Sequence, residues 1–186
     1  MAISVATYLV YRLYLKASGD GDGIVGRGRG RSGQPKLLQN PQEKYSVPLI
    51  EKEEISSDTR RFRFGLPSSE HVLGLPTGQH VYISTTLNGK FVSRSYTPVS
   101  SDDDKGYIDL VIKVYFANQN PKYPNGGQLT QHLENMKIGE TINIRGPNGH
   151  LIYDGCGKFS IRSGFKAPYK AQNYKKVSIV FLSSFF

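Results

Sequence analysis

GQHVYISTTLNGKFVSRSYTPV, residues 78–99, contains two β-rich runs joined by an Asn-Gly pair. Such a pair favours a two-residue turn, because both residues of that turn need positive φ. The stretch therefore predicts a β-hairpin with its turn at residues 88–90. The second run ends at Pro98, which has no N–H group to donate to a neighbouring strand.

Several other segments have the apolar periodicity of two that is typical of strands. In TRRFRFGLP, residues 59–67, Phe62, Phe64 and Leu66 alternate with Arg61, Arg63 and Gly65. The most β-rich segment is GYIDLVIKVYF, residues 106–116, which we expect to be the central strand of a sheet. ETINIRGPNGHLIY, residues 140–153, predicts two more strands around a Pro-Asn-Gly turn.

One segment has helical periodicity instead. In QLTQHLENM, residues 128–136, Leu129, Leu133 and Met136 recur at i, i+4 and i+7. Five or six short strands and a single helix predict a mainly β fold, an antiparallel barrel.

The net charge of +9 is unevenly distributed. Residues 37–154 carry twelve basic and thirteen acidic side chains, so the basic excess lies at the two ends. A nearly neutral middle offers no basic face to nucleic acid. The Arg-Gly repeats at residues 26–31 leave RNA binding open as one alternative, and a solvated linker is the other.

The first 17 residues are apolar but interrupted by Arg12, and they are too short to span a membrane unaided. A membrane hook and an end without fixed structure both stay open. Residues 18–36 follow as a flexible Gly/Arg-rich linker. The single cysteine, Cys156, excludes an internal disulfide, and the four histidines have no metal-ligand spacing, so we expect no metal site.

Arg94 and Tyr96 have the spacing of residues on one face of a strand, and Thr97 follows at its end. A guanidinium beside an aromatic ring can hold a phosphate and a flat ring together. We expect Lys113 and Tyr115 of the next strand to meet this pair across the sheet. Two glycines open the helix, where free N–H groups favour an anion. A solvated cross-strand pair and an ordinary glycine turn remain the alternatives.

Three segments resemble the FAD domain of the NADH-cytochrome b5 reductase family, within the ferredoxin-reductase-like flavoenzymes. They are KYSVPLIEKEEISSDTRRFRFGLPS, RSYTPVSSDDDKGYIDLVIKVYF and NPKYPNGGQLTQHLENMKIGETINIRGPNGHLIYDGCGKF, and the resemblance covers about residues 36–161. It implies a six-stranded antiparallel Greek-key barrel with one short covering helix over residues 37–161. It also implies a truncated NADH domain, of which residues 162–186 would form the linker and the first strand.

The resemblance also implies roles for individual residues. Arg94 would hold the FAD pyrophosphate, Tyr96 would pack on the isoalloxazine, and Thr97 would hydrogen-bond near the flavin N5. Lys113 would face the incoming NADH, so Thr97 and Lys113 are the predicted catalytic residues. The full set of predicted cofactor-binding residues is Arg94, Ser95, Tyr96, Thr97, Val111, Ile112, Lys113, Tyr115, Phe116, Gly126, Gly127, Gln128, Leu129 and Thr130.

Two positions depart from the family's pattern: Ser95 stands where proline is usual, and Gln128 where lysine is frequent. The implied function is an FAD-dependent oxidoreductase that passes electrons from NADH through FAD to cytochrome b5 or a similar haem protein. The implied location is the cytosolic face of the endoplasmic reticulum or mitochondrial outer membrane, or the cytoplasm. A catalytically incomplete FAD-binding module is the alternative.

Overall fold

The computed structural model describes residues 33–175, and ten strands and helices follow one another in this range. The predicted membrane hook at residues 1–17, most of the predicted linker, and residues 176–186 lie outside the described residues. Within the described range, no helix is long and apolar enough to cross a membrane. The elements are β1 (Tyr45–Ser56), β2 (Thr59–Gly65), β3 (His80–Leu87), β4 (Lys90–Tyr96), β5 (Tyr107–Lys113), α2 (Gln128–Asn135), β6 (Thr141–Asn148), β7 (Leu151–Gly155), β8 (Lys158–Ile161) and β9 (Lys170–Asn173).

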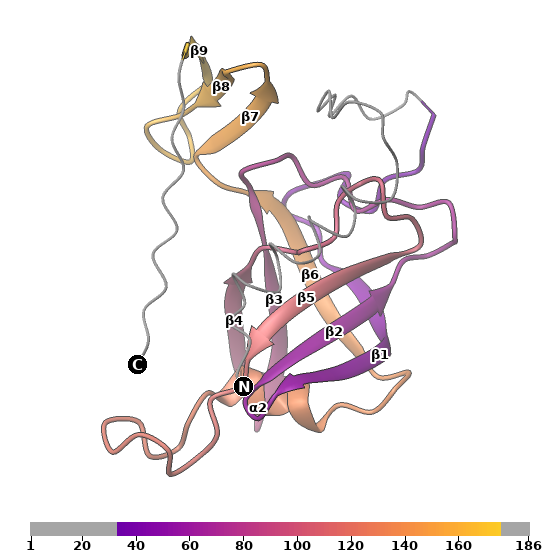
Figure 1. Ribbon diagram of the computed structural model, residues 1–186, viewed down its shortest axis with the longest axis vertical. Coiled ribbons are helices and arrows are strands. Elements are labelled where there is room, and N and C mark those ends of the chain that lie inside the picture. The colour runs from indigo at the N-terminus through magenta and orange to yellow at the C-terminus, as the bar shows by residue number, and fades with distance from the viewer. Residues whose placement is uncertain (1–32, 176–186) are drawn as a thin grey trace.

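Six strands form one antiparallel sheet in the order β4-β3-β6-β1-β2-β5, which curls around a single core (Figure 1). The mainly β fold with one covering helix is confirmed. Among residues 33–175, β4 and β5 are the two edges of this sheet and share no ladder, so the barrel is not fully closed.

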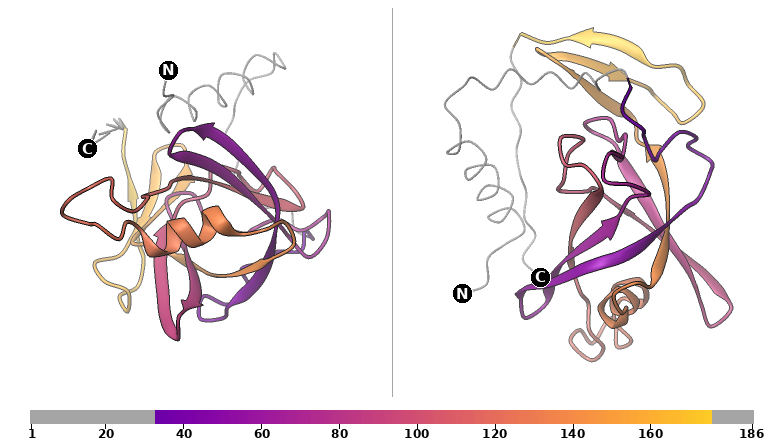
Figure 2. Two further views of the ribbon diagram at one scale, coloured as in Figure 1. Left: turned by 90° about the horizontal axis from the view of Figure 1, so that it is seen from below. Right: turned by 90° about the vertical axis from the view of Figure 1, so that its right-hand side faces the viewer.

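The core is built from the inward positions of the predicted alternation. Phe62 and Phe64 of β2 are fully buried, as is Ile108 of β5. α2 lies across one end of the barrel, and its Leu129 and Leu133 complete the core there (Figure 2). The short amphipathic helix predicted from the sequence is therefore confirmed.

The β3–β4 hairpin has the predicted turn. Leu87 pairs with Lys90, and the two residues between them, Asn88 and Gly89, have φ of 49° and 75°. Positive φ at both positions is the requirement that the Asn-Gly pair meets.

The prediction that residues 106–116 form the central strand is wrong, because β5 lies at an edge of the sheet. Its hydrophobicity has another cause. The curled sheet buries its inner face, and arginines of the neighbouring β2 cover its outer face. There Arg63 donates two hydrogen bonds, both 2.8 Å, to the Asp109 carboxylate, and Arg61 contacts the same carboxylate at 3.4 Å.

The membership of the barrel also differs from the prediction. β1 was not predicted as a strand, because the charged residues Glu51–Glu54 mask its apolar alternation. In the structure, Glu51 and Glu53 form ion pairs with Arg61 of the neighbouring strand β2. The predicted strand at residues 151–153 belongs instead to a separate sheet of β7, β8 and β9. β6 continues through Asn148, which pairs with His80, and the chain then leaves the barrel at Gly149.

The β7–β8–β9 sheet lies at the end of the barrel opposite α2 (Figures 1 and 2). Tyr169 joins the two parts, since its hydroxyl donates to the Gly149 carbonyl at 3.1 Å and accepts from the Gln79 side chain at 2.6 Å. The predicted boundary at residues 161 and 162 falls between β8 and β9 of this sheet.

Candidate functional site

A pocket of about 520 Å³ lies between the end of β4 and the start of α2. Segments that are 19 or more residues apart in the sequence contribute to it, because the β4 edge and the chain that follows the β5 edge approach each other near α2. The lining residues are Arg94, Ser95, Tyr96, Tyr115, Asn125, Gly126, Gly127, Gln128, Leu129 and Thr130.

Arg94 supplies a cation to this pocket. Its side chain is exposed, and its Nη1 donates to the neighbouring Ser93 carbonyl at 2.7 Å. Among the ion pairs of residues 33–175, none includes Arg94. Its remaining N–H groups are therefore available to an anionic ligand.

Tyr96 places a phenol ring beside this cation. Burial raises the pKa of the Tyr96 phenol above its ordinary value, and the nearby Tyr115 acts in the same direction, while Arg94 partly offsets the rise. Tyr96 is therefore neutral at physiological pH. The exposed Tyr115 adds a second aromatic ring to the lining.

The glycine pair allows α2 to begin close to the chain that follows β5. Gly127 N–H donates to the Tyr115 carbonyl at 2.8 Å, and Tyr115 N–H donates to Thr130 Oγ1 at 3.2 Å. A Cβ on Gly126 would collide with the Tyr115 carbonyl oxygen, and Gly126 has a φ of +63°. Only glycine suits this position.

Thr130 is buried, and its hydroxyl hydrogen bonds are internal. The hydroxyl donates to the Gly127 carbonyl at 3.1 Å and accepts from Tyr115 N–H. The Thr130 hydroxyl proton is therefore already in a hydrogen bond to the Gly127 carbonyl and is not offered to a phosphate oxygen in this structure. Thr130 joins the helix, the glycine turn and Tyr115.

The N-terminus of α2 is open toward the pocket. Its N-cap, Gly127, makes no side-chain capping hydrogen bond. The helical hydrogen-bond pattern begins with Gln131 N–H to the Gly127 carbonyl at 2.9 Å. The N–H groups of residues 128–130 consequently have no acceptor within the helix, and they carry the positive end of its dipole.

Nine of the fourteen predicted cofactor-binding residues line this pocket. The other five, Thr97, Val111, Ile112, Lys113 and Phe116, are not among its lining residues. Thr97 is exposed and directly follows Tyr96, whereas the Ile112 side chain is buried in the barrel core.

The expectation that Lys113 meets Arg94 and Tyr96 across the sheet is wrong, because β4 and β5 are opposite edges of the sheet and share no ladder. Its Nζ lies 3.1 Å from Asp58 Oδ2 in the β1–β2 turn. Burial raises the pKa of Asp58, but hydrogen bonds from Lys113, Thr59 and Ser56 outweigh this effect and leave it below its ordinary value.

Asn125 is a lining residue that the sequence reasoning missed. Its position immediately before the glycine pair was the available signal. The Gln131 side-chain amide donates a hydrogen bond of 2.8 Å to the Asn125 carbonyl, which connects this turn to the first turn of α2.

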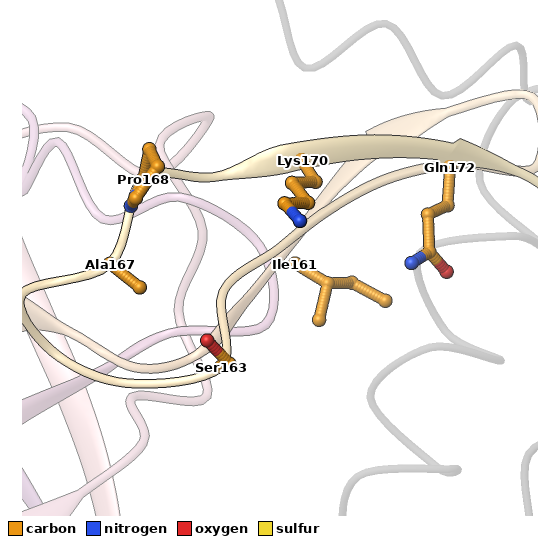
Figure 3. A pocket seen from close by; sticks show the side chains of 6 residues that line it. All are labelled: Ile161, Ser163, Ala167, Pro168, Lys170 and Gln172. Atoms are coloured by element: carbon orange, nitrogen blue, oxygen red, sulfur yellow. The ribbon is translucent and has the colours of Figure 1, made fainter.

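A second hollow of about 450 Å³ lies on the small sheet (Figure 3). It is lined by Ile161, Ser163, Ala167, Pro168, Lys170 and Gln172. This lining is largely apolar and includes none of the predicted site residues, so the candidate site is the pocket beside α2.

The family of oxidoreductase FAD-binding domains matches residues 46–153. This match covers more than half of the 186 residues and includes every residue that lines the pocket beside α2. The chain belongs to the oxidoreductase FAD-binding domain family. The resemblance inferred from the motifs is confirmed.

Two curated relatives of this FAD-binding family member are similar to it over most of its length. NADH-cytochrome b5 reductase 2 of Danio rerio is 52% identical over 180 residues, which are 97% of this chain and 57% of the relative. NADH-cytochrome b5 reductase 2 of Homo sapiens is 60% identical over 132 residues, which are 71% of this chain and 48% of the relative. The chain thus spans about half the length of the curated relatives it matches.

A solved structure supports the same family assignment. The cytochrome b5 reductase domain of Ulva prolifera nitrate reductase matches with a TM-score of 0.68 and 39% identity. The match covers 76% of this chain and 50% of that structure. The FAD-binding fold extends over most of the residues described above.

Proposed function

We propose that the pocket beside α2 binds FAD and that the chain serves NADH-dependent electron transfer to cytochrome b5 or a similar haem protein. The observation that carries the proposal is the combination of donors in one pocket. Arg94, a cation with no ion pair among residues 33–175, lies with two phenol rings and an uncapped helix N-terminus. This set matches a cofactor that carries both a pyrophosphate and a flat ring.

In the proposed complex, Arg94 donates charge-assisted hydrogen bonds to the pyrophosphate. The N–H groups of Gln128 and Leu129 supply further donors, and the helix dipole favours the same negative charge. Tyr96 offers its ring face to the isoalloxazine, and Thr97 offers a hydroxyl near the flavin N5. Gln128 adds no charge here, so Arg94 is the principal cation of the site.

FAD, when bound, accepts a hydride from NADH and releases electrons singly to a haem acceptor. The donor and acceptor are proposed from the names of the relatives, which are NADH-cytochrome b5 reductases. Lys113 is proposed to face NADH, and its ion pair with Asp58 holds it at the end of β5. We propose a cytosolic or membrane-surface location by the same similarity.

An absorption spectrum of the purified chain with added FAD, recorded from about 300 to 550 nm, tests this proposal. A protein-bound flavin band is expected, and Arg94→Ala should lower its occupancy at limiting FAD. A chain that retains no flavin after gel filtration would contradict the FAD site. Anaerobic NADH then tests the donor: a band that bleaches supports the reductase function, and a bound band that stays unbleached supports an FAD-binding module without turnover.

A further inference from the structure

The segment that follows β4 is tied to the opposite edge of the barrel. Val99 N–H donates to the Asp109 carbonyl at 2.9 Å, and Asp109 N–H donates to Ser100 Oγ at 2.9 Å. In an ordinary antiparallel rung, the two paired residues exchange both backbone hydrogen bonds. Here the Ser100 hydroxyl takes the place that the Val99 carbonyl would have in such a rung.

A proline lies between β4 and this rung. Pro98 has no N–H group with which to extend the β3–β4 ladder, so β4 ends before the chain reaches Val99. The segment that follows β4 meets β5 at this mixed rung, which has one backbone acceptor and one hydroxyl acceptor.

The other partner of the rung, Asp109, is held firmly. Its side chain is fully buried, and its carboxylate accepts two hydrogen bonds of 2.8 Å from Arg63. Arg61 also contacts this carboxylate at 3.4 Å. A bidentate, charge-assisted pair of this kind fixes both position and orientation. Ser100 is consequently hydrogen-bonded to a residue, Asp109, whose position in the barrel is fixed by its arginine partners.

We infer that Ser100 is a positioning residue for residues 94–97, and this inference rests on the proposed FAD site. Only Pro98 and Val99 separate Ser100 from Thr97, and the proline ring restricts the backbone between them. The mixed rung thus fixes the end of the segment that presents Arg94 and Tyr96 to the pocket. Ser100 itself need not touch the cofactor.

The test compares three full-length variants: Ser100→Ala, which removes the acceptor, Ser100→Thr, which keeps a hydroxyl, and Ser101→Ala. Ser101 is a matched control, because the hydrogen bonds of its hydroxyl within residues 33–175 are to Asp103 of its own turn. Two quantities are measured, the exchange rate of the Asp109 and Val99 amides by NMR without FAD, and FAD affinity by fluorescence titration.

Ser100→Ala should speed exchange of the Asp109 amide by about tenfold and weaken FAD binding by roughly three- to tenfold, as expected for one lost hydrogen bond. The visible band of bound FAD should also change shape, which a loss of global stability alone would not cause. Ser100→Thr and Ser101→Ala should resemble the wild type.

Unchanged amide exchange in Ser100→Ala would overturn the inference, as would faster exchange without any change in FAD affinity or spectrum. In both cases FAD binding by the wild type would leave the proposed function standing. A wild type that does not bind FAD would overturn the proposed function and this positioning role together.

Discussion

At the scale of single residues, the pocket depends on one cation, Arg94, that has no competing carboxylate in the part of the chain that the structure describes. Arg94 lies near the end of β4, where it is exposed and its side chain donates to the adjacent Ser93 carbonyl. Thr130 has the opposite character, because its hydroxyl is already engaged on both sides. The two residues therefore contribute differently: one offers free donors to a ligand, and the other maintains the shape of the turn.

Arg94→Ala is expected to weaken FAD binding by about 1.5–3 kcal/mol, the range for a hydrogen bond to a charged group. Fluorescence titration of FAD at two salt concentrations measures the effect, which should shrink as salt rises. Lys90→Ala, at an exposed position on the same strand, serves as the control and should bind like the wild type. Equal losses in the two variants would argue against a specific phosphate contact.

At the scale of elements, the site is a junction between the start of α2 and the chain leaving β5. Gly127 N–H donates to the Tyr115 carbonyl, and Tyr115 N–H donates to the Thr130 hydroxyl, so each segment fixes the position of the other. Close approach of two backbones is possible here because residues 126 and 127 have no side chains.

Gly126→Ala is expected to destabilise the protein by roughly 1–3 kcal/mol and to weaken FAD binding, since it combines left-handed strain with a steric clash. Gly139→Ala is the matched control: Gly139 also has positive φ, +93°, but an added Cβ meets nothing within 4 Å. Urea unfolding and FAD titration measure the two effects. If Gly126→Ala were no more harmful than Gly139→Ala, the close approach would not matter.

The turn between β1 and β2 is joined to the end of β5 by Asp58, whose backbone carbonyl accepts Val114 N–H at 2.6 Å and whose carboxylate pairs with Lys113. The pKa of Asp58 lies below its ordinary 3.8, so the ionised group stabilises the folded state above about this pH. That contribution disappears as the pH falls through the lower folded-state pKa.

Asp58→Asn should therefore reduce the free energy of unfolding by up to about 1 kcal/mol near neutral pH, the range for a partly exposed pair. The difference from the wild type should shrink as the pH is lowered below about 3.8, where the unfolded-state carboxyl becomes protonated. Urea unfolding between pH 2.5 and 7 measures this difference. A difference of constant size down to pH 2.5 would exclude this linkage.

At the scale of the whole molecule, the barrel has a hydrophobic interior and an ionic cover on the outer face of β1, β2 and β5. Burial lowers the pKa of Arg61, but the hydrogen bonds that Arg61 donates to Glu53 and Glu51 outweigh this effect and raise it. The hydrogen bond to Asp109 raises the pKa of Arg63. Both arginines are consequently charged at physiological pH, and the buried Asp109 carboxylate depends on these two partners.

Arg63→Ala should destabilise the fold by about 3–5 kcal/mol, because it leaves a buried carboxylate with incomplete compensation. Arg145→Ala is the control, since Arg145 stacks on Tyr82 at 5.4 Å and has no ion pair among those of the described residues. It should lose less than about 1 kcal/mol, the scale of an exposed cation–π contact. Similar unfolding midpoints for both variants would contradict the role assigned to the network.

Local sequence patterns were sufficient to predict the parts of the fold whose geometry is determined by a few neighbouring residues. The Asn88-Gly89 turn, the inward Phe62 and Phe64, and the apolar side of α2 all follow from backbone preference or side-chain periodicity. The family resemblance likewise depended on short motifs, and nine of its predicted site residues share one pocket.

Tertiary structure decided which strands share a sheet and what each polar group contacts. A run as apolar as residues 106–116 has the same pattern in a central strand as at a barrel edge, so only sheet order distinguishes them. Sequence spacing also cannot reveal that Lys113 pairs with Asp58, or that Ser100 accepts the Asp109 amide. These contacts arise between segments brought together by the curl of the sheet, whereas turns and periodicity are properties of the local chain.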